Sequence, residues 1–199
     1  MACGFQGFDQ ELYDRIHDAS GKMLIFAAPT NESNVSEIAY PARHHAEVFC
    51  TFSTDGCINT SRRLNPTIGV EGYNFAILGE NIKTFSGEEK SGTSFSTAIA
   101  AGLAARLLDF SKHRDCQGKL SRHASMMKIK YGMSKVLCAM SIADAGFQCL
   151  KPWQLLPKDL REHVPFDEYG PPDEIKKQLA RAHICSIILH SLDEDLGPR

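Results

Sequence analysis

The chain has 199 residues, of which 43% are hydrophobic and 23% are charged, and its formal net charge is −2. This composition is typical of a folded globular protein and excludes wholesale disorder, and no apolar run reaches the ~18 residues that a membrane-spanning helix needs. The seven cysteines are scattered without the C-x-x-C spacing of a zinc site. An odd number of scattered cysteines favours reduced thiols, which are typical of intracellular proteins, so we expect an intracellular location. We also expect no signal peptide, no metal, no cofactor and no membrane partner.

The charge is unevenly distributed along the chain. Residues 106–135 carry eight basic and two acidic side chains, whereas the segments before and after them are acidic. A basic block attracts nucleic acid in principle, but this one has little aromatic interleaving and no known binding pattern. A solvated helix-and-loop face explains it better, so we expect no nucleic-acid partner.

The first half of the chain alternates between helical and strand-like patterns. Apolar residues at near-helical spacing predict an amphipathic helix over residues 9–20, which Gly21 ends. Short apolar runs predict strands at 22–28, 46–53 and 73–78, separated by turn residues. This alternation predicts an α/β fold with a mostly parallel sheet and covering helices.

The second half is predicted to be helical. We expect a helix over residues 94–110, a loop at 115–118 and an amphipathic helix within 126–145. A terminal helix over 173–192, capped by Asp173, precedes an acidic tail. We therefore predict a helical C-terminal extension over residues 113–199.

The most informative segment is the turn that leads into the alanine-rich helix. Ser91-Gly92-Thr93-Ser94 places a serine on the first helical turn, where unpaired N–H groups and the helix dipole favour a negative charge. A nucleophile would be well placed here, although Ser94 as an ordinary helix cap explains the short motif equally well. Within the helix, Gly102 predicts close approach by a neighbouring strand or helix, and the low charge before Arg106 predicts burial on most sides.

These residues resemble a known family. Gly92-Thr93-Ser94-Phe95-Ser96 is similar to the serine signature of the subtilisin-like peptidases (peptidase S8, subtilases), with Thr97 where the family usually has proline. Upstream, the strand at 22–28 runs into Pro29-Thr30-Asn31, which resembles the strand that ends at the family's oxyanion asparagine. The resemblance implies that Ser94 is the nucleophile and that Asn31 donates to the oxyanion. Taken alone, Asn31 would suit a turn.

The resemblance extends over residues 1–112 and is closest to fungal subtilases that lie within larger proteins. The segment Met1–Phe5 is similar to the edge strand that pairs with the substrate backbone, so Cys3, Gly4 and Ala28 are implied to line the substrate groove. The resemblance implies a partial subtilisin-like three-layer fold and a peptide or protein substrate. Residues 1–112 would be the C-terminal half of the catalytic domain.

The family's other two catalytic residues are missing. Subtilisin-like enzymes use an aspartate and a histidine that precede the serine, but this chain has no Asp-Thr-Gly and no His-Gly-Thr. None of its eight histidines lies in a pattern that predicts a catalytic base. Since a serine hydroxyl without a base is a weak nucleophile, we expect this chain to be inactive alone.

Three functions follow from these patterns. The first is a serine endopeptidase whose N-terminal half is absent. The second is a non-catalytic subtilase remnant that acts in binding or assembly, and the third is an unrelated α/β protein in which Ser94 only caps a helix. Because a truncated sheet exposes an edge and an apolar face, the missing half or another chain is the expected protein partner.

Overall fold

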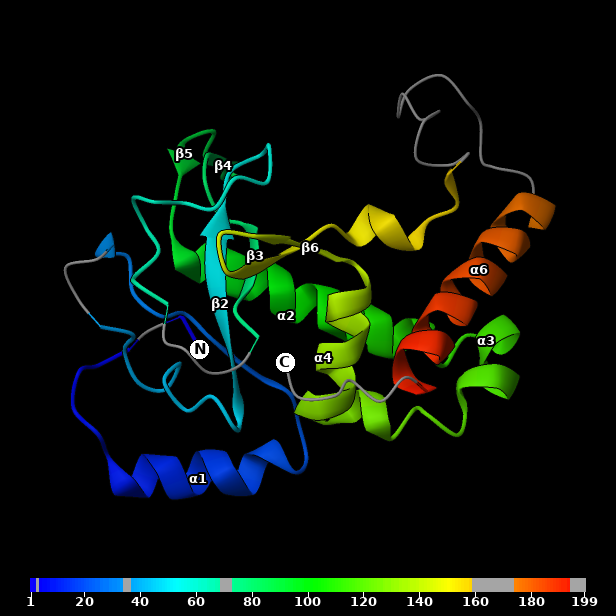
Figure 1. Ribbon diagram of the computed structural model, residues 1–199, viewed down its shortest axis with the longest axis horizontal. Helices are drawn as coiled ribbons and strands as arrows, with labels where there is room; N and C mark the ends of the chain where they lie inside the picture. The colour runs from blue at the N-terminus through cyan, green and yellow to red at the C-terminus, as the bar shows by residue number, and fades with distance from the viewer. Residues whose placement is uncertain (3, 34–36, 69–72, 159–173, 194–199) are drawn as a thin grey trace.

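The structure is a computed structural model that describes residues 1–2, 4–33, 37–68, 73–158 and 174–193 (Figure 1). Its elements in chain order, with η marking 3-10 helices, are α1 (Gln10–Ser20), β1 (Ile25–Ala27), β2 (Val48–Thr54), β3 (Phe75–Leu78), β4 (Ile82–Lys83), β5 (Glu89–Lys90), α2 (Thr93–Phe110), α3 (Arg114–Leu120), η2 (Met126–Lys128), α4 (Lys130–Ala139), β6 (Ser141–Asp144), β7 (Phe147–Leu150), η3 (Pro152–Leu155) and α6 (Glu174–Asp193). Among these residues, no helix combines the length and apolar character needed to cross a bilayer.

The main sheet has the strand order β1-β2-β3-β7-β6. Strands β1, β2, β3 and β7 run parallel, and β6 pairs antiparallel with β7. All seven residues of β2 are buried, as expected for a central strand of a parallel sheet that is covered on both faces. The three strands predicted from the first half of the sequence are therefore present, each within a few residues of its expected range.

Helices cover both faces of this sheet, which gives three layers. Phe26, Phe49 and Phe75 point to one face, where they join residues of α2, α4 and α6 in the larger hydrophobic cluster. Their strand neighbours point to the opposite face and pack with Ile16 of α1. Figure 1 shows α2 running behind the strands. The predicted α/β fold with a mostly parallel sheet and covering helices is confirmed.

The segment after residue 112 differs from its prediction, because it is only partly helical. Residues 115–118 lie within helix α3 instead of a loop, and the predicted helix over 126–145 is divided into η2, α4 and β6. A turn with positive φ at Ala145 (48°) and Gly146 (87°) reverses the chain, so that β7 joins β3 in the main sheet. The main sheet therefore includes strands from both sides of residue 112. The division of the chain into two domains at that residue stays a prediction.

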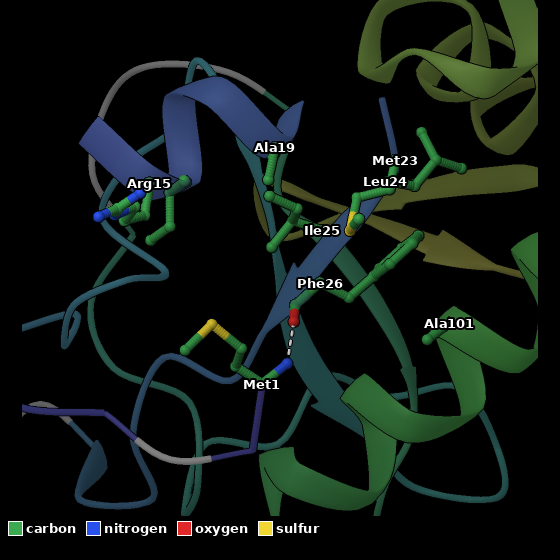
Figure 2. Close-up of a pocket in the computed structure, with 9 residues that line it drawn as sticks. Met1, Arg15, Ala19, Met23, Leu24, Ile25, Phe26 and Ala101 are labelled. Atoms are coloured by element: carbon green, nitrogen blue, oxygen red, sulfur yellow. Dashed lines mark hydrogen bonds between the residues drawn. The ribbon is translucent and has the colours of Figure 1, made fainter. Parts of the chain in front are cut away.

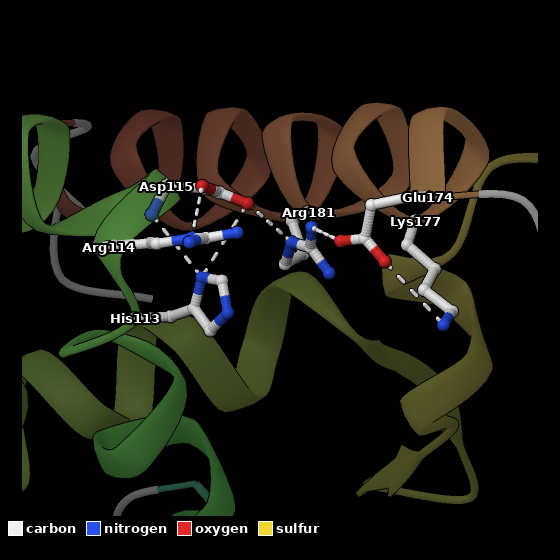
Figure 3. A network of polar contacts seen from close by, with 6 residues as sticks. All are labelled: His113, Arg114, Asp115, Glu174, Lys177 and Arg181. Atoms are coloured by element: carbon white, nitrogen blue, oxygen red, sulfur yellow. Dashed lines mark hydrogen bonds and ion pairs between the residues drawn. The ribbon is translucent and has the colours of Figure 1, made fainter.

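Helix α6 packs against α3 through buried apolar residues and a polar network. Arg181 on α6 donates to Asp115 on α3 at 2.7 Å and to Glu174 at 2.8 Å (Figure 3). Beneath this network, Cys185 and Ile188 are buried in the larger cluster. The predicted terminal helix is therefore present from Glu174, while its predicted cap, Asp173, lies outside the described residues.

Helix α2 is buried on one side, and the prediction that it is buried on most sides is wrong. Its buried residues face the sheet and are Thr93, Ser96, Thr97, Ala100, Ala104 and Leu107. The opposite side exposes Ala98, Ile99, Gly102 and Ala105. A Cβ atom added to Gly102 would meet no heavy atom within 4 Å, so the close approach predicted at this glycine does not occur among the described residues.

Lys130 is a half-buried cation that lies against the core. Its amine lies over the Phe49 ring at 5.5 Å and donates to the backbone carbonyl of His45. Burial lowers the pKa of this amine from 10.5 to about 8, although the nearby Glu47 carboxylate opposes the shift. Below pH 8 the folded protein therefore carries a partly desolvated charge that costs stability.

We predict that the stability of the wild-type protein, relative to Lys130→Met, rises with pH. Between pH 8 and 10.5 the unfolded chain binds a proton at Lys130 that the folded chain has released, so deprotonation favours the folded state in this window. The difference in free energy of unfolding should grow by at most about 1.4 kcal/mol per pH unit. Urea unfolding of both proteins at pH 7.5 and 9.5 measures it, and a difference that stays constant would contradict the prediction.

Candidate active site

The candidate site lies where the carboxyl ends of the parallel strands meet the start of α2. The chain leaves β1 at Ala27 and reaches Asn31 four residues later, while the segment after β3 begins at Gly79. Helix α2 then starts at Thr93, next to both segments. In open α/β sheets, ligands bind at this edge, because loops and helix N-termini converge there.

Two hydrogen bonds join Asn31 to the residue before Ser94. The Asn31 Oδ1 atom accepts from the backbone N–H of Thr93 at 2.7 Å and from the Thr93 hydroxyl at 2.9 Å. The same hydroxyl also lies 3.1 Å from the carbonyl oxygen of Thr30. These contacts fix both the side chain of Asn31 and the start of α2, although the two segments are 62 residues apart in sequence.

The second polar atom of the Asn31 amide remains available as a donor. Its Nδ2 atom makes no hydrogen bond with the described residues, and Asn31 is exposed. A Cβ atom added to Gly92 would lie 3.5 Å from Nδ2, which is an ordinary van der Waals contact, so the amide lies close to this turn. The hydrogen bonds from Thr93 thus position the Asn31 N–H₂ group beside the first turn of α2.

Ser94 belongs to that first turn but does not cap the helix. The N-cap residue is Gly92, and it makes no side-chain capping bond. The Ser94 hydroxyl donates instead to the backbone carbonyl of Ala2 at 3.1 Å. Its backbone N–H is among the first four of the helix, which have no carbonyl partner within the helix. The capping interpretation of Ser94 therefore does not match the structure.

The N-terminal residues lie along the edge of β1 that faces away from β2, close to Ser94. The Ala28 N–H donates to the carbonyl of Met1 at 3.0 Å, and the amino group of Met1 donates to the carbonyl of Phe26 (Figure 2). Ala28 is buried, and Gly4 lies against Ala39 and Tyr40, where an added Cβ would come within 2.8 Å of the Ala39 Cβ. Cys3 lies outside the described residues, so the substrate-groove role of Cys3, Gly4 and Ala28 stays a prediction.

Close packing at Gly79 holds the strand end against the helix start. The Gly92 N–H donates to the Gly79 carbonyl at 2.8 Å. A Cβ atom added to Gly79 would lie 2.0 Å from the Ser96 hydroxyl oxygen and 2.4 Å from that of Ser53. A larger residue at this position would force both serine hydroxyls to move. Sequence analysis missed both Gly79 and Thr93 as supports of the site, because their partners are distant in sequence.

No described histidine takes the place of a catalytic base. His17 contacts Glu47 at 3.2 Å, and His44 packs between the rings of Tyr13 and Tyr40, where burial lowers its pKa. Both lie near the amino end of β2, whereas Ser94 lies at the carboxyl end of the sheet. In the part of the chain that is described, the Ser94 hydroxyl bonds to a carbonyl and to no imidazole.

A metal centre is equally unsupported by the geometry. Across the described ranges, no three His, Cys, Asp or Glu side chains gather closely enough to hold a metal ion. The chemistry that the site offers is therefore that of a hydroxyl, a carboxamide and helix N–H groups.

Comparison with known proteins places this arrangement in context. No protein-family model matches the chain. The chain is 25% identical over 136 residues to the subtilisin-like protease het-Q2 of Podospora anserina, a match that covers 62% of this chain and 37% of that protein. The comparison supports a relationship to the subtilisin-like proteases.

Solved structures show the same fold. The protease domain of PatA, solved as a mutant, superimposes with a TM-score of 0.56 at 20% identity, covering 75% of this chain and 53% of that one. The prenylagaramide maturation protease PagA gives a TM-score of 0.55 at 18% identity, covering 76% and 56% respectively. The chain thus spans 37% of the curated relative and little more than half of these two solved chains.

Proposed function

We propose that this chain is the C-terminal half of a subtilisin-like serine endopeptidase domain, with Ser94 as the nucleophile and Asn31 as an oxyanion donor. The observation that carries the proposal is the pair of hydrogen bonds from Thr93 to Asn31, which holds a free carboxamide N–H₂ beside Ser94. The relationship to a subtilisin-like protease and the shared fold support it.

The proposed reaction is acyl transfer from a peptide bond. The Ser94 oxygen attacks the scissile carbonyl carbon, and the negative charge that develops on the carbonyl oxygen is stabilised by the Ser94 N–H and the Asn31 Nδ2. The serine proton passes to a histidine, which then gives it to the leaving amine, and water releases the acyl group from Ser94. The histidine and its supporting aspartate come from outside this chain.

The chain alone is proposed to be inactive. Its nucleophile lacks a base among the described residues, and its hydroxyl donates a hydrogen bond to the carbonyl of Ala2 instead. A serine hydroxyl without general-base assistance reacts slowly. The position of Ser94 at the N-terminus of α2 favours the oxyanion but does not remove the serine proton.

The proposed partner is a polypeptide that supplies the missing half. The exposed side of α2, formed by Ala98, Ile99, Gly102 and Ala105, is small and apolar, and it leads directly to the turn that carries Ser94. Next to it, a cavity of about 420 Å³ opens between α1, β1 and α2 and is lined by Leu24, Phe26 and Ala101 among others (Figure 2). A second polypeptide that packs here would cover apolar surface and reach Ser94.

Labelling with a fluorophosphonate tests this proposal, because the probe reacts only with an activated serine. We expect no labelling of the chain alone. When it is co-expressed with the part of the het-Q2 protease that this chain does not match, we expect labelling that Ser94→Ala abolishes. Mass spectrometry of the labelled peptide identifies the serine.

Two outcomes would contradict parts of the proposal. If the chain alone is labelled at Ser94, a base is present and the chain is not inactive. If a complex forms but Ser94 is never labelled, the peptidase proposal fails and the chain is a non-catalytic remnant that binds a partner.

A further inference from the structure

A two-stranded hairpin projects from the chain between β3 and the nucleophile turn. Strands β4 and β5 pair antiparallel, Ile82 with Lys90 and Lys83 with Glu89. At the base of the hairpin, Gly92 donates to Gly79 at 2.8 Å and the Asn81 N–H donates to the Ser91 hydroxyl at 2.9 Å. We call residues 80–91 the arm. Figure 1 shows it beyond the end of β2, on the side of the molecule where the sheet strands finish.

The arm is ordered by its own hydrogen bonds, although it buries almost nothing. None of residues 81–90 is buried, and only Ile82 and Thr84 are half-buried. An isolated two-stranded hairpin is marginally stable in water. Its fixed base, two residues from Thr93, is therefore what anchors the arm next to the turn that carries Ser94.

The turn at the tip presents Phe85 to solvent. Gly87, at φ 82°, donates to the Thr84 carbonyl at 2.9 Å, and the Thr84 N–H and hydroxyl both donate to the Glu88 carbonyl at 2.9 Å. This is a three-residue hairpin loop with glycine in the left-handed position. Phe85 occupies the first corner of the turn, a position that most residue types suit, so the turn itself does not require a phenylalanine.

Phe85 is the most exposed large hydrophobic side chain of the described residues. Its exposed fraction is 111%, whereas Ile175 and Leu179, the next most exposed, are at 65%. Single surface hydrophobics are common in proteins and need no explanation. Phe85 differs from them because a hydrogen-bonded turn holds it fully clear of the chain, at the tip of a hairpin whose base adjoins the turn that carries Ser94.

We propose that the arm is a protein-substrate contact of the peptidase site, in which Phe85 binds an apolar side chain of an extended substrate segment that lies across Ser94. This inference rests on the proposed function. The base of the arm is continuous with the nucleophile turn through Gly92 and Thr93, so a polypeptide bound at Ser94 passes close to it. A short peptide that does not reach the arm would not use this contact.

Binding of an unfolded protein to the Ser94→Ala chain tests the contact without turnover. The probe is fluorescently labelled, reduced and carboxymethylated α-lactalbumin, measured by anisotropy. Phe85→Ala in this background is expected to weaken binding about tenfold, the size expected for one partly buried phenylalanine. Phe85→Leu should restore binding to within about threefold, because the contact is apolar. Melting temperature should not change, because the side chain packs against nothing.

Leu179→Ala is the matched control, because it removes an exposed apolar side chain from α6, away from the site. It should leave binding unchanged. The proposal is overturned if the Ser94→Ala chain does not bind the probe or if adding Phe85→Ala leaves its affinity unchanged. It is also overturned if Leu179→Ala weakens binding as much as Phe85→Ala does. Fluorophosphonate labelling of Ser94 in the complemented protein tests the proposed function separately. If Ser94 is labelled but Phe85→Ala does not weaken binding of the probe, the arm proposal alone fails. If Phe85→Ala weakens binding but Ser94 is never labelled, the peptidase proposal fails, and Phe85 is a contact of a binding surface without catalysis.

Discussion

Asn31→Asp is expected to leave the chain folded and to slow labelling of Ser94 in the complemented protein by about 10²–10³-fold, the cost of losing one such donor in subtilisin itself. An aspartate retains the oxygen that accepts from the Thr93 N–H and hydroxyl, at 2.7 and 2.9 Å in the wild-type chain. It replaces the Nδ2 donor with a second oxygen, which repels the developing oxyanion. The positive end of the α2 dipole tolerates the new charge.

Asn31→Leu separates the structural role of this residue from its chemical role. Leucine fills a similar volume but removes the acceptor, so the Thr93 N–H loses its partner, although the Thr93 hydroxyl keeps the Thr30 carbonyl. Thr93 is completely buried, and leaving its N–H without an acceptor should cost about 1–3 kcal/mol of unfolding free energy. Urea unfolding and labelling rates of both variants distinguish the two effects. An Asn31→Asp protein that is labelled as fast as wild type would rule out Nδ2 as the oxyanion donor.

The parallel part of the sheet was predictable from sequence because burial on both faces leaves a local signature. Strand β2 is buried at all seven positions, so its apolar character is visible without knowledge of its neighbours. Strand β6 carries no such signal, because three of its four residues are exposed and its place is set by pairing with β7. Its sequence therefore extended the preceding helical pattern, and the segment was predicted to be helix.

The two candidate site residues were predictable from sequence, but their supports were not. Ser94 and Asn31 each lie in a short motif, and the structure brings their segments together, while their catalytic roles stay predictions. Thr93 and Gly79 act through contacts with residues that are distant in sequence, Asn31 for the first and Ser53 for the second. Residues of this kind have no local pattern, because their role is defined by what packs against them.

Glycines show the same limit more sharply, since sequence alone cannot tell which ones lie at a close contact. Gly102 was predicted to lie against a neighbour, yet an added Cβ would meet nothing among the described residues. Gly132, in the first turn of α4, was not predicted to lie at a close contact, yet it is buried against η2. A Cβ atom there would lie 2.1 Å from the carbonyl oxygen of Met126 and 2.5 Å from its carbonyl carbon.

Gly132→Ala is therefore expected to lower the free energy of unfolding by about 2–4 kcal/mol. The clash is with backbone atoms, which no change of side-chain rotamer can relieve, so η2 must move away from α4 and disturb the core around Met127 and Met133. The cost of the clash has to exceed the gain of about 1 kcal/mol that alanine brings to a helix. Urea unfolding at pH 7 measures the difference directly.

Gly102→Ala is the control, because it makes the same chemical change in a helix where space is open. It should raise the free energy of unfolding of the isolated chain by about 1 kcal/mol, through helix propensity and the lower entropy of the unfolded state. Opposite signs for the two substitutions would establish that the Met126 contact, and not the loss of glycine as such, governs the effect. A Gly132→Ala protein within about 0.5 kcal/mol of wild type would mean that η2 and α4 do not approach each other this closely.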